Sequence, residues 1–474
     1  MLTINRFVSR IYLSNLLFSI LLFFLSFILY LFAPHFYSNL YCSFLLIIYI
    51  IASIKLVKIT TINSNYFTFH LLFVVSFFFV NFVYPVFIYP ISPTYYSVFL
   101  YKFNHDIITK ATALALLGFN AFLIGVSTKI DNPIYSGFKN KVNLGSIEFF
   151  INLILFFVFI SILFIVGSPL IKGTYGATYN ISSGLQILFQ VLISISIVLA
   201  FYTKSYNGNF VDFLKKFRKT VLFSLIFFLL IFIFSGDRGP AVQVMLLSIA
   251  GFTIFVKPVK LRSFIILALI GMLTLTFISY ARTQTKTDKS VSLSKGFKYI
   301  KLDSFYDIGM DLIVNNRNLY VGYEYANRNG FSYGKSMSYN VFAPFPLIPS
   351  LYTKHFFNST PEDLATATII TKESKMTYGV GTNVIVDLYM NFGVLGVILF
   401  MSFLGSIVTG LHFNAVYSNN LNHIIAYLIF VSLSIYIPRS TVFDPLRPIV
   451  WALGIIYTLK IVRIALLKLS LRRQ

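Results

Sequence analysis

Long apolar stretches dominate the pattern of hydrophobic and polar positions along this chain. An α-helix needs about 20 apolar residues to cross the hydrocarbon core of a bilayer, whereas the strands of a transmembrane barrel show only short alternating segments. The pattern therefore predicts an all-α, polytopic transmembrane protein with about 12 transmembrane helices. The predicted segments are 11–32, 39–56, 68–90, 107–127, 147–166, 185–203, 220–235, 239–256, 263–281, 384–411, 421–438 and 447–467.

The distribution of positive charge predicts how these helices are oriented across the membrane. The formal net charge is +23 at pH 7, although 57% of the residues are hydrophobic and only 11% are charged. In a soluble protein this balance would suggest nucleic acid, but much of the charge lies in short loops between the predicted helices, so we expect no nucleic-acid partner. The basic loops fall on one side of the predicted membrane, and the positive-inside rule then places both termini in the cytoplasm.

The same rule divides the chain into three parts. Residues 1–281 are expected to hold transmembrane helices 1–9, residues 282–383 to form one large periplasmic loop, and residues 384–474 to hold transmembrane helices 10–12. Residues 301–314 place apolar side chains at helical spacing, which predicts an amphipathic helix at the bilayer surface. We interpret Asp303, Asp307 and Asp311 as the wet face of that helix.

A second stretch of the loop, FAPFPLIP at 342–349, contains three prolines. Proline cannot sit inside a helix without removing a backbone hydrogen bond, and it restricts the residue before it to extended conformations. We therefore expect an extended, rigid segment here.

Acidic and arginine residues gather at the outer ends of the predicted helices. Asp106, Asp237, Asp387 and Asp444 lie there, as do Arg238, Arg282, Arg439 and Arg447, while Arg317 and Arg328 lie in the loop. The positive-inside rule predicts fewer cations on this side, so it does not explain the arginines. They are candidates for binding an anionic group.

The densest polar motif is SGDRGP at 235–240, between two apolar runs. Its glycines and proline interrupt the helix and allow a ligand to approach the backbone, and the planar fork of Arg238 suits phosphate oxygens. A tight interhelical turn with an Asp237–Arg238 pair is the alternative interpretation.

A second motif surrounds Asp387, at the start of the predicted helix that follows the loop. Asn383, Asp387 and Asn391 share one helix face by their spacing of four residues, and Tyr389 lies between them. A buried carboxylate at this position is a candidate general base, because desolvation raises its pKa. Neutralisation of an arginine is the competing interpretation.

The third motif is PRSTVFDPLRP at 438–448, between the last two predicted helices. Arg439 and Arg447, held among prolines, suit an anionic ligand, and snorkelling to lipid phosphates is the alternative. His355 in the loop is a weaker candidate for taking a proton from a hydroxyl. No Asp-x-Asp, His-x-x-x-His or glycine-rich nucleotide loop occurs in a suitable context, so we expect no metal and no cofactor.

With these motifs in this order, the chain resembles the O-antigen polymerase (Wzy) family of bacterial oligosaccharide repeat-unit polymerases. The resemblance covers the layout of about a dozen helices, the large loop before the last three, SGDRGP, FAPFPLIP and GTNVIVDLYMNFGVLG at 381–396. Relatives often carry Glu where this chain has Asp387, which is shorter by one methylene.

The resemblance implies a metal-independent glycosyltransferase of the GT-C class in the bacterial inner membrane. It implies undecaprenyl-pyrophosphate-linked oligosaccharides as donor and acceptor, membrane lipids as surroundings and a polysaccharide chain-length regulator as a partner. Arginines would then stabilise the pyrophosphate leaving group. We expect Arg238, Arg282 and Arg439 or Arg447 to hold it, with Asp387, or less favourably His355, as the base. Asp237, Arg317, Arg328, Tyr389 and Asn391 are the further candidate substrate-binding residues, and Tyr352, Phe356 and Phe357 could stack on sugars.

Two other functions fit the same pattern. An O-antigen ligase shares the architecture and the donor, and the sequence separates it poorly from a polymerase. A flippase for the lipid-linked unit belongs to another class, but transporters of this size usually show two related halves and polar groups near the midplane. Neither feature is visible in this sequence.

Overall fold

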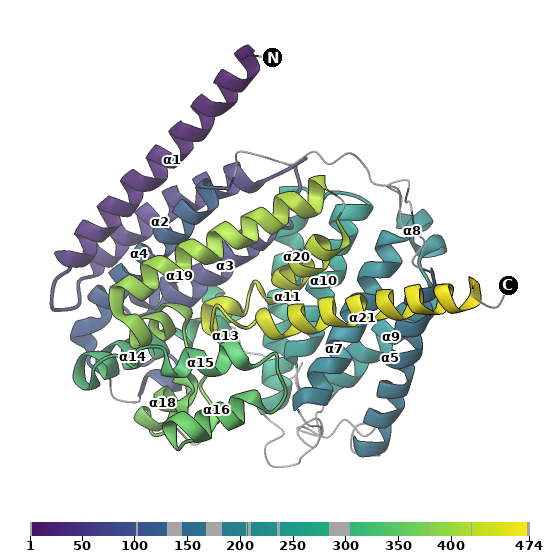
Figure 1. Cartoon of the computed structure of the whole chain (residues 1–474). Helices are drawn as coiled ribbons and strands as arrows, with labels where there is room; N and C mark the ends of the chain where they lie inside the picture. Colours follow the sequence, from purple (N-terminus) through teal and green to yellow (C-terminus); the bar gives the residue numbers. More distant parts are fainter. Residues whose placement is uncertain are drawn as a thin grey trace.

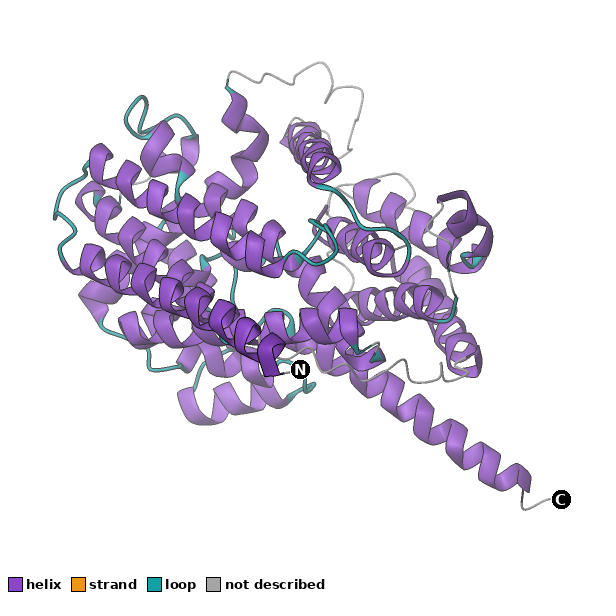
Figure 2. Ribbon diagram, turned by 90° about the horizontal axis from the view of Figure 1, so that it is seen from above, coloured by secondary structure: helices purple, strands orange, loops and turns teal. Residues whose placement is uncertain are grey.

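A computed structural model describes residues 2–100, 103–129, 145–166, 183–204, 206, 210–234, 238–283, 304–376, 378–418 and 420–471. The elements in these ranges are helices joined by loops (Figure 2). Six helices are long and apolar enough to cross a membrane: α1, α2, α4, α7, α19 and α21. Shorter apolar helices occupy the other predicted segments, so the expected all-α, polytopic membrane fold is confirmed.

One group of helices is built around α4 and α19, which lie side by side in Figure 1. α4 (Ile108–Ser127) is almost entirely buried because α1 (Leu2–Leu31), α2 (Asn39–Thr60) and α19 (Val384–Tyr417) pack around it. α3 (Phe69–Asn81) lies against α2 and is followed by a π-helix at Tyr84–Ile88.

The close approach of α4 and α19 depends on glycine. A Cβ atom on Gly125 would collide with the backbone carbonyl of Ser402, and one on Gly405 would collide with that of Phe122. Small residues let helix backbones approach in this way inside membranes, where packing replaces the hydrophobic effect as the main attraction between helices. These contacts fix α19 as a rigid support on α4.

The second group contains most of the remaining apolar helices (Figure 1). Its bounds are α5 Gly145–Val166, α7 Ser183–Tyr202, α8 Phe210–Lys216, α9 Lys219–Phe234, α10 Arg238–Phe255, α11 Leu261–Thr283, α20 Leu421–Leu433 and α21 Leu446–Leu471. α7 packs against α5, α9, α10 and α21, whereas α20 contacts both α10 and α19. α20 therefore joins the two groups.

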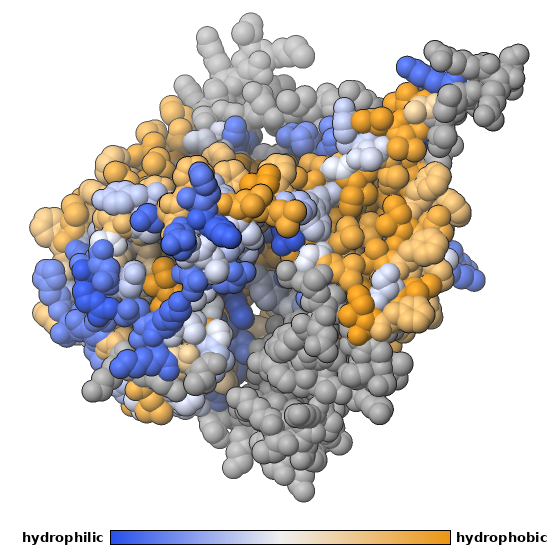
Figure 3. Space-filling model, turned by 60° about the horizontal axis from the view of Figure 1, so that its bottom comes forward, coloured by the Kyte–Doolittle hydropathy of each residue, from blue (hydrophilic) through white to orange (hydrophobic). Residues whose placement is uncertain are grey.

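The predicted loop folds into short helices that lie together at the lower left of Figure 1. They are a 3₁₀-helix at Phe305–Gly309, α13 Met310–Ile313, α14 Asn316–Asn329, α15 Lys335–Phe342, α16 Ile348–Phe357, α17 Pro361–Leu364 and α18 Thr366–Glu373. Figure 3 shows hydrophilic residues gathered on this side of the molecule and apolar surface on the other side. This part is therefore the polar side of the described chain.

Two details of the loop differ from the sequence-based expectation. Residues 305–313 form two short helices rather than one long one, and Asp307 is buried instead of wet. The hydroxyls of Tyr95 and Tyr96 donate to its carboxylate at 3.0 and 2.9 Å, which offsets the cost of burial. Asp303 lies outside the described residues.

The proline-rich segment at 342–349 forms turns rather than an extended strand-like connection. α16 begins at Ile348 with Pro349 in its first turn, where the missing backbone N–H has no cost because first-turn donors lack intrahelical partners. The prolines thus shape the entry to a helix.

Candidate functional site

The amino end of α19 is fixed by its cap. The Asn383 side chain accepts a hydrogen bond from the backbone N–H of Ile385 at 2.9 Å and donates to Asn81 of α3 at 2.9 Å. Gly381 precedes this cap with a φ of +74°, a left-handed conformation that favours glycine. The GTN sequence therefore turns the chain into the helix and ties it to α3.

One turn later, α19 carries Asp387, which is 2% exposed. The hydroxyl of Thr366, the first residue of α18, donates to its Oδ1 at 2.6 Å. Among the described residues, no group hydrogen-bonds to Oδ2, although Thr441 of the loop before α21 contributes to the electrostatic environment of the carboxylate. A buried carboxylate oxygen without a donor is a strong acceptor for a substrate hydroxyl.

Asn391, a turn beyond Asp387, joins α19 to α15. Its side-chain amide donates to the Ser336 hydroxyl at 2.7 Å and to the Asp387 carbonyl at 2.8 Å, while the Ser332 hydroxyl donates to its Oδ1 at 2.7 Å. Ser336 also lies 3.1 Å from the Thr366 hydroxyl. Asp387, Thr366, Ser336 and Asn391 therefore form one connected polar network, which holds the carboxylate in place.

The helix is interrupted directly after this network. Gly393 has a φ of +63° and a ψ of −152°, which frees the carbonyls of Met390 and Asn391 from helical pairing. The backbone N–H groups of Ser332 and Tyr333 donate to these two carbonyls at 2.8 and 2.9 Å. The loop before α15 is thereby bonded to the end of the polar helical segment.

Tyr389 lies on the same segment and is almost fully buried. Its hydroxyl donates to Asn327 of α14 at 2.8 Å, and its ring stacks on Tyr323 with the centroids 4.7 Å apart. These contacts attach α14 to α19.

The loop between α20 and α21 brings the third sequence motif to the second. The Arg439 carbonyl lies against Gly381, and Thr441 and Asp444 are electrostatic neighbours of Asp387. The Tyr436 hydroxyl also donates to the Gly239 carbonyl at 3.4 Å, in the SGDRGP motif. The second and third motifs therefore meet at the amino end of α19, and Gly239 of the first motif contacts Tyr436, two residues before the third.

Asp444 is the second carboxylate of this region and is half-buried. Desolvation raises its pKa to about 6, and the Asp387 carboxylate adds to the shift, whereas hydrogen bonds from Ser440 and Thr441 oppose it. Sequence reasoning placed Asp444 at an outer helix end but gave it no role. It also missed Thr366, Ser336 and Thr441, because polar residues are common in loops and their polarity alone does not identify them as part of a site.

Two of the predicted arginines lie in or beside the same loop. Arg439 donates to the Asp311 carbonyl at 3.3 Å and lies over the Tyr436 ring at 5.7 Å. Arg447, in the first turn of α21, lies over Trp451 at 4.6 Å, and the Trp451 indole donates to the Pro344 carbonyl at 2.6 Å. The aromatic rings orient both guanidinium groups.

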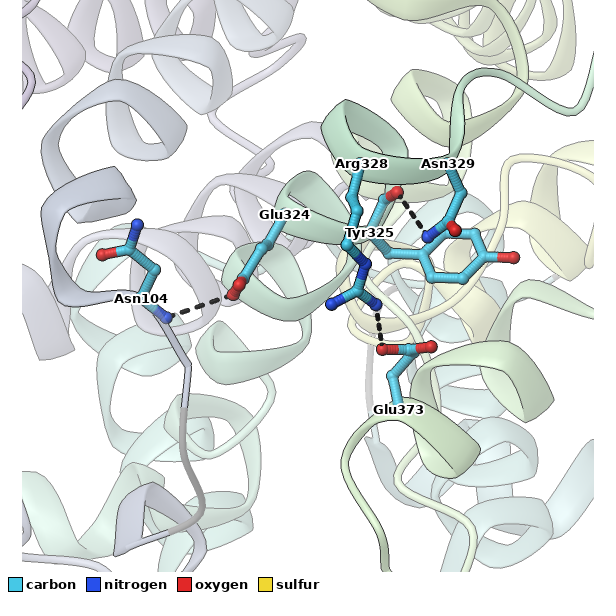
Figure 4. A network of polar contacts seen from close by, with 6 residues as sticks. All are labelled: Asn104, Glu324, Tyr325, Arg328, Asn329 and Glu373. Carbon is cyan, nitrogen blue, oxygen red and sulfur yellow. Dashed lines mark hydrogen bonds and ion pairs between the residues drawn. The ribbon is translucent and has the colours of Figure 1, made fainter.

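The two loop arginines have different surroundings. Arg317 is fully buried near the start of α14. Arg328, at the other end of α14, is exposed and forms an ion pair with Glu373 of α18 at 2.5 Å (Figure 4). In the same view Glu324 accepts from the backbone N–H of Asn104 at 3.1 Å. Arg328 thus joins two surface helices.

Four further candidates from the sequence remain: His355, Arg238, Arg282 and Asp237. His355 is exposed on α16 and contacts the Phe356 ring at 5.0 Å, and Tyr352 contacts both Phe356 and Phe357. The backbones of Arg238 and Arg282 belong to the first turn of α10 and the last turn of α11. Asp237 lies outside the described residues. Their roles stay predictions.

Residues 15–470 match the family described as O-antigen polysaccharide polymerase Wzy. No curated protein and no solved structure matches the chain.

Proposed function

Since the chain belongs to the O-antigen polysaccharide polymerase Wzy family, we propose that Asp387 is the general base of its glycosyl-transfer site. The protein is a multi-pass membrane protein that polymerises lipid-linked oligosaccharide repeat units into O-antigen. The match to a polymerase family does not favour the ligase or the flippase.

The observation that carries the proposal is the meeting of two motifs, distant in the sequence, around a buried, partly unsatisfied carboxylate. Oδ1 of Asp387 is held by Thr366, whereas Oδ2 accepts no hydrogen bond within the described chain. An acceptor sugar hydroxyl that donates to Oδ2 would lose its proton to the carboxylate as it attacks.

In the proposed reaction, the acceptor oxygen forms a bond to the anomeric carbon of the donor sugar. The bond between that carbon and the lipid pyrophosphate breaks, and its electron pair leaves with the pyrophosphate. The hydroxyl proton passes to Asp387. The products are a lengthened glycan and a lipid pyrophosphate, so no oxidant, reductant or nucleotide is needed.

Cations must stabilise the charge that develops on the pyrophosphate, and arginine suits this role because its fork binds two phosphate oxygens at once. Arg439 and Arg447 lie in or beside the loop that reaches Asp387. Arg238 begins the helix whose Gly239 is bonded to that loop. We propose that these residues, with Arg282, hold an undecaprenyl-pyrophosphate donor without a metal ion, as in GT-C enzymes.

The decisive experiment is polymerisation of lipid-linked repeat units by the purified protein in liposomes. Asp387→Asn keeps the size of the side chain and removes the base. We expect the ladder of products to fall by about 10² to 10⁴ in rate. Asp363→Asn is the matched control, because Asp363 is an exposed carboxylate paired with Lys372, and it should keep the wild-type ladder.

Polymerisation by Asp387→Asn at the rate of Asp363→Asn would refute the role of Asp387. Thermal unfolding of both variants would check that neither change disturbs the fold. A product capped with one repeat on lipopolysaccharide core, instead of a ladder, would favour a ligase.

The proposed chemistry places residues 282–383 at the periplasmic face. Leu347 is 77% exposed in this region, and Cys42 is the single, buried cysteine. Lys215 is exposed in a basic segment that the positive-inside rule assigns to the cytoplasm. In a Cys42→Ala background, Leu347→Cys should react with a membrane-impermeant maleimide added to spheroplasts, whereas Lys215→Cys should react only after lysis. The reverse labelling would overturn the orientation and with it the site.

A further inference from the structure

A cavity of about 640 Å³ opens between α5 and α9, within the range of ligand-binding pockets. Phe149 and Phe156 of α5 and Phe223 of α9 line it and are 61%, 56% and 68% exposed. In a membrane protein such exposed rings face lipid, so the cavity is open to the bilayer.

The lining changes from cationic to apolar along α9. Arg218 and Lys219 lie at the amino end of α9, and Thr220 and Ser224 follow, whereas Phe227 lies about 12 Å further along the axis. The cations thus lie at one end of the α9 lining, and Phe223 and Phe227 extend away from them, as the acyl chain of a phospholipid extends from its headgroup.

The charge at the cationic end favours an anion. Arg218 forms an ion pair with the buried Glu148 at 2.7 Å, and Lys216 pairs with Asp212 at 2.9 Å. Lys219 lines the cavity next to Arg218, and Lys204 lies near Glu148. Apart from the neutral Lys216–Asp212 pair, three cations thus share this end of the cavity with one carboxylate among the described residues, so its net charge is positive.

We propose that this cavity binds one anionic phospholipid, with its phosphate at Lys219 and Arg218 and one acyl chain along Phe223 and Phe227. Basic pockets between transmembrane helices recognise anionic headgroups in this way. The site is separate from the Asp387 network and does not depend on the proposed reaction.

Native mass spectrometry of the full chain, with phosphatidylglycerol or phosphatidylethanolamine added in detergent, tests the proposal. We expect one tightly held phosphatidylglycerol and weaker binding of phosphatidylethanolamine. Lys219→Gln should weaken the phosphatidylglycerol adduct about fivefold, since one interfacial cation is lost. Lys215→Gln removes the same charge from an exposed lysine that does not line the cavity and should leave the adduct unchanged.

Ser224→Trp provides a second variant, because it fills the cavity and leaves the cations in place. It should abolish the adduct. Ser224→Leu is a smaller change that replaces it if Ser224→Trp does not fold. Equal retention of the two lipids by the wild type would overturn the proposal. Equal effects of Lys219→Gln and Lys215→Gln would also overturn it, because they would indicate a diffuse surface charge. Dimerisation through this face in place of lipid binding would be a third contrary result.

Discussion

The two halves of α19 differ in what holds them. Beyond Gly393 the helix is an apolar rod, and Val397, Met401, Leu404 and Val408 are buried at helical spacing. Before Gly393 the helix is held by hydrogen bonds from Asn391, Ser332 and Thr366. Packing makes the segment after Gly393 rigid. Directional hydrogen bonds give the segment before Gly393 a fixed geometry for chemistry.

Breaking the packed half should have the largest effect. Gly405→Val places side-chain atoms where the Phe122 backbone lies, so α4 and α19 must separate. We expect loss of folded protein, measured as the yield of monodisperse protein after detergent extraction. Gly410→Val is the matched control because nothing lies within 4 Å of a Cβ atom there. Equal yields would show that the helix backbones do not approach as described.

Disturbing the junction between the halves should have an intermediate effect. Gly393→Ala forces a side chain into a conformation that is almost restricted to glycine, with a Cβ atom 2.9 Å from the Phe331 ring. The cost is about 1–3 kcal/mol. We expect a lower unfolding temperature and slower polymerisation with the helical content retained. Gly410→Ala should change neither quantity, and an unaltered Gly393→Ala enzyme would contradict the importance of the break.

Changing Asp444, the second carboxylate beside the polar half of α19, should have the smallest effect. Burial raises the Asp444 pKa to about 6, from about 3.9 in an unfolded chain. Between these values the folded state keeps a proton that the unfolded state has lost, so this group lowers the unfolding free energy as pH rises from about 4 to about 7. Asp444→Asn removes that loss.

Thermal unfolding of wild type and Asp444→Asn at pH 5 and pH 8 measures this contribution. We expect the variant to gain about 1–2 °C relative to wild type on going to pH 8, because the unfolding entropy of so long a chain is large. A constant difference between the two proteins at both pH values would mean that Asp444 titrates normally. Asp363→Asn serves as the exposed control.

The apolar half of α19 could be predicted from the sequence, because long hydrophobic runs determine membrane helices with little influence from tertiary contacts. The predicted segment 384–411 corresponds to Val384–Tyr417, and 107–127 corresponds to Ile108–Ser127. The spacing of Asp387 and Asn391 likewise predicted a shared helix face. The break at Gly393 was not predicted, since a glycine within an apolar run is common in membrane helices.

The partners of Asp387 could not be predicted. Thr366 and Asp444 lie 21 and 57 positions away from it in the sequence, and only the folding of the loop helices brings them close. The helix expected at 301–314 was too long because the sequence pattern does not reveal that Tyr95 and Tyr96 bury Asp307. Short helices that are held by such specific contacts have no strong periodic signal.

The interruption at Gly393 also has a mechanical consequence. Ser332 and Tyr333 are bonded to the last carbonyls of the polar segment, so the short helix α15 and the segment 384–391 are joined as one body. A displacement of the loop helices would move Asp387 together with the groups that hydrogen-bond to its network, and the apolar half of α19 would stay packed on α4. The arrangement around the carboxylate would then survive such a movement.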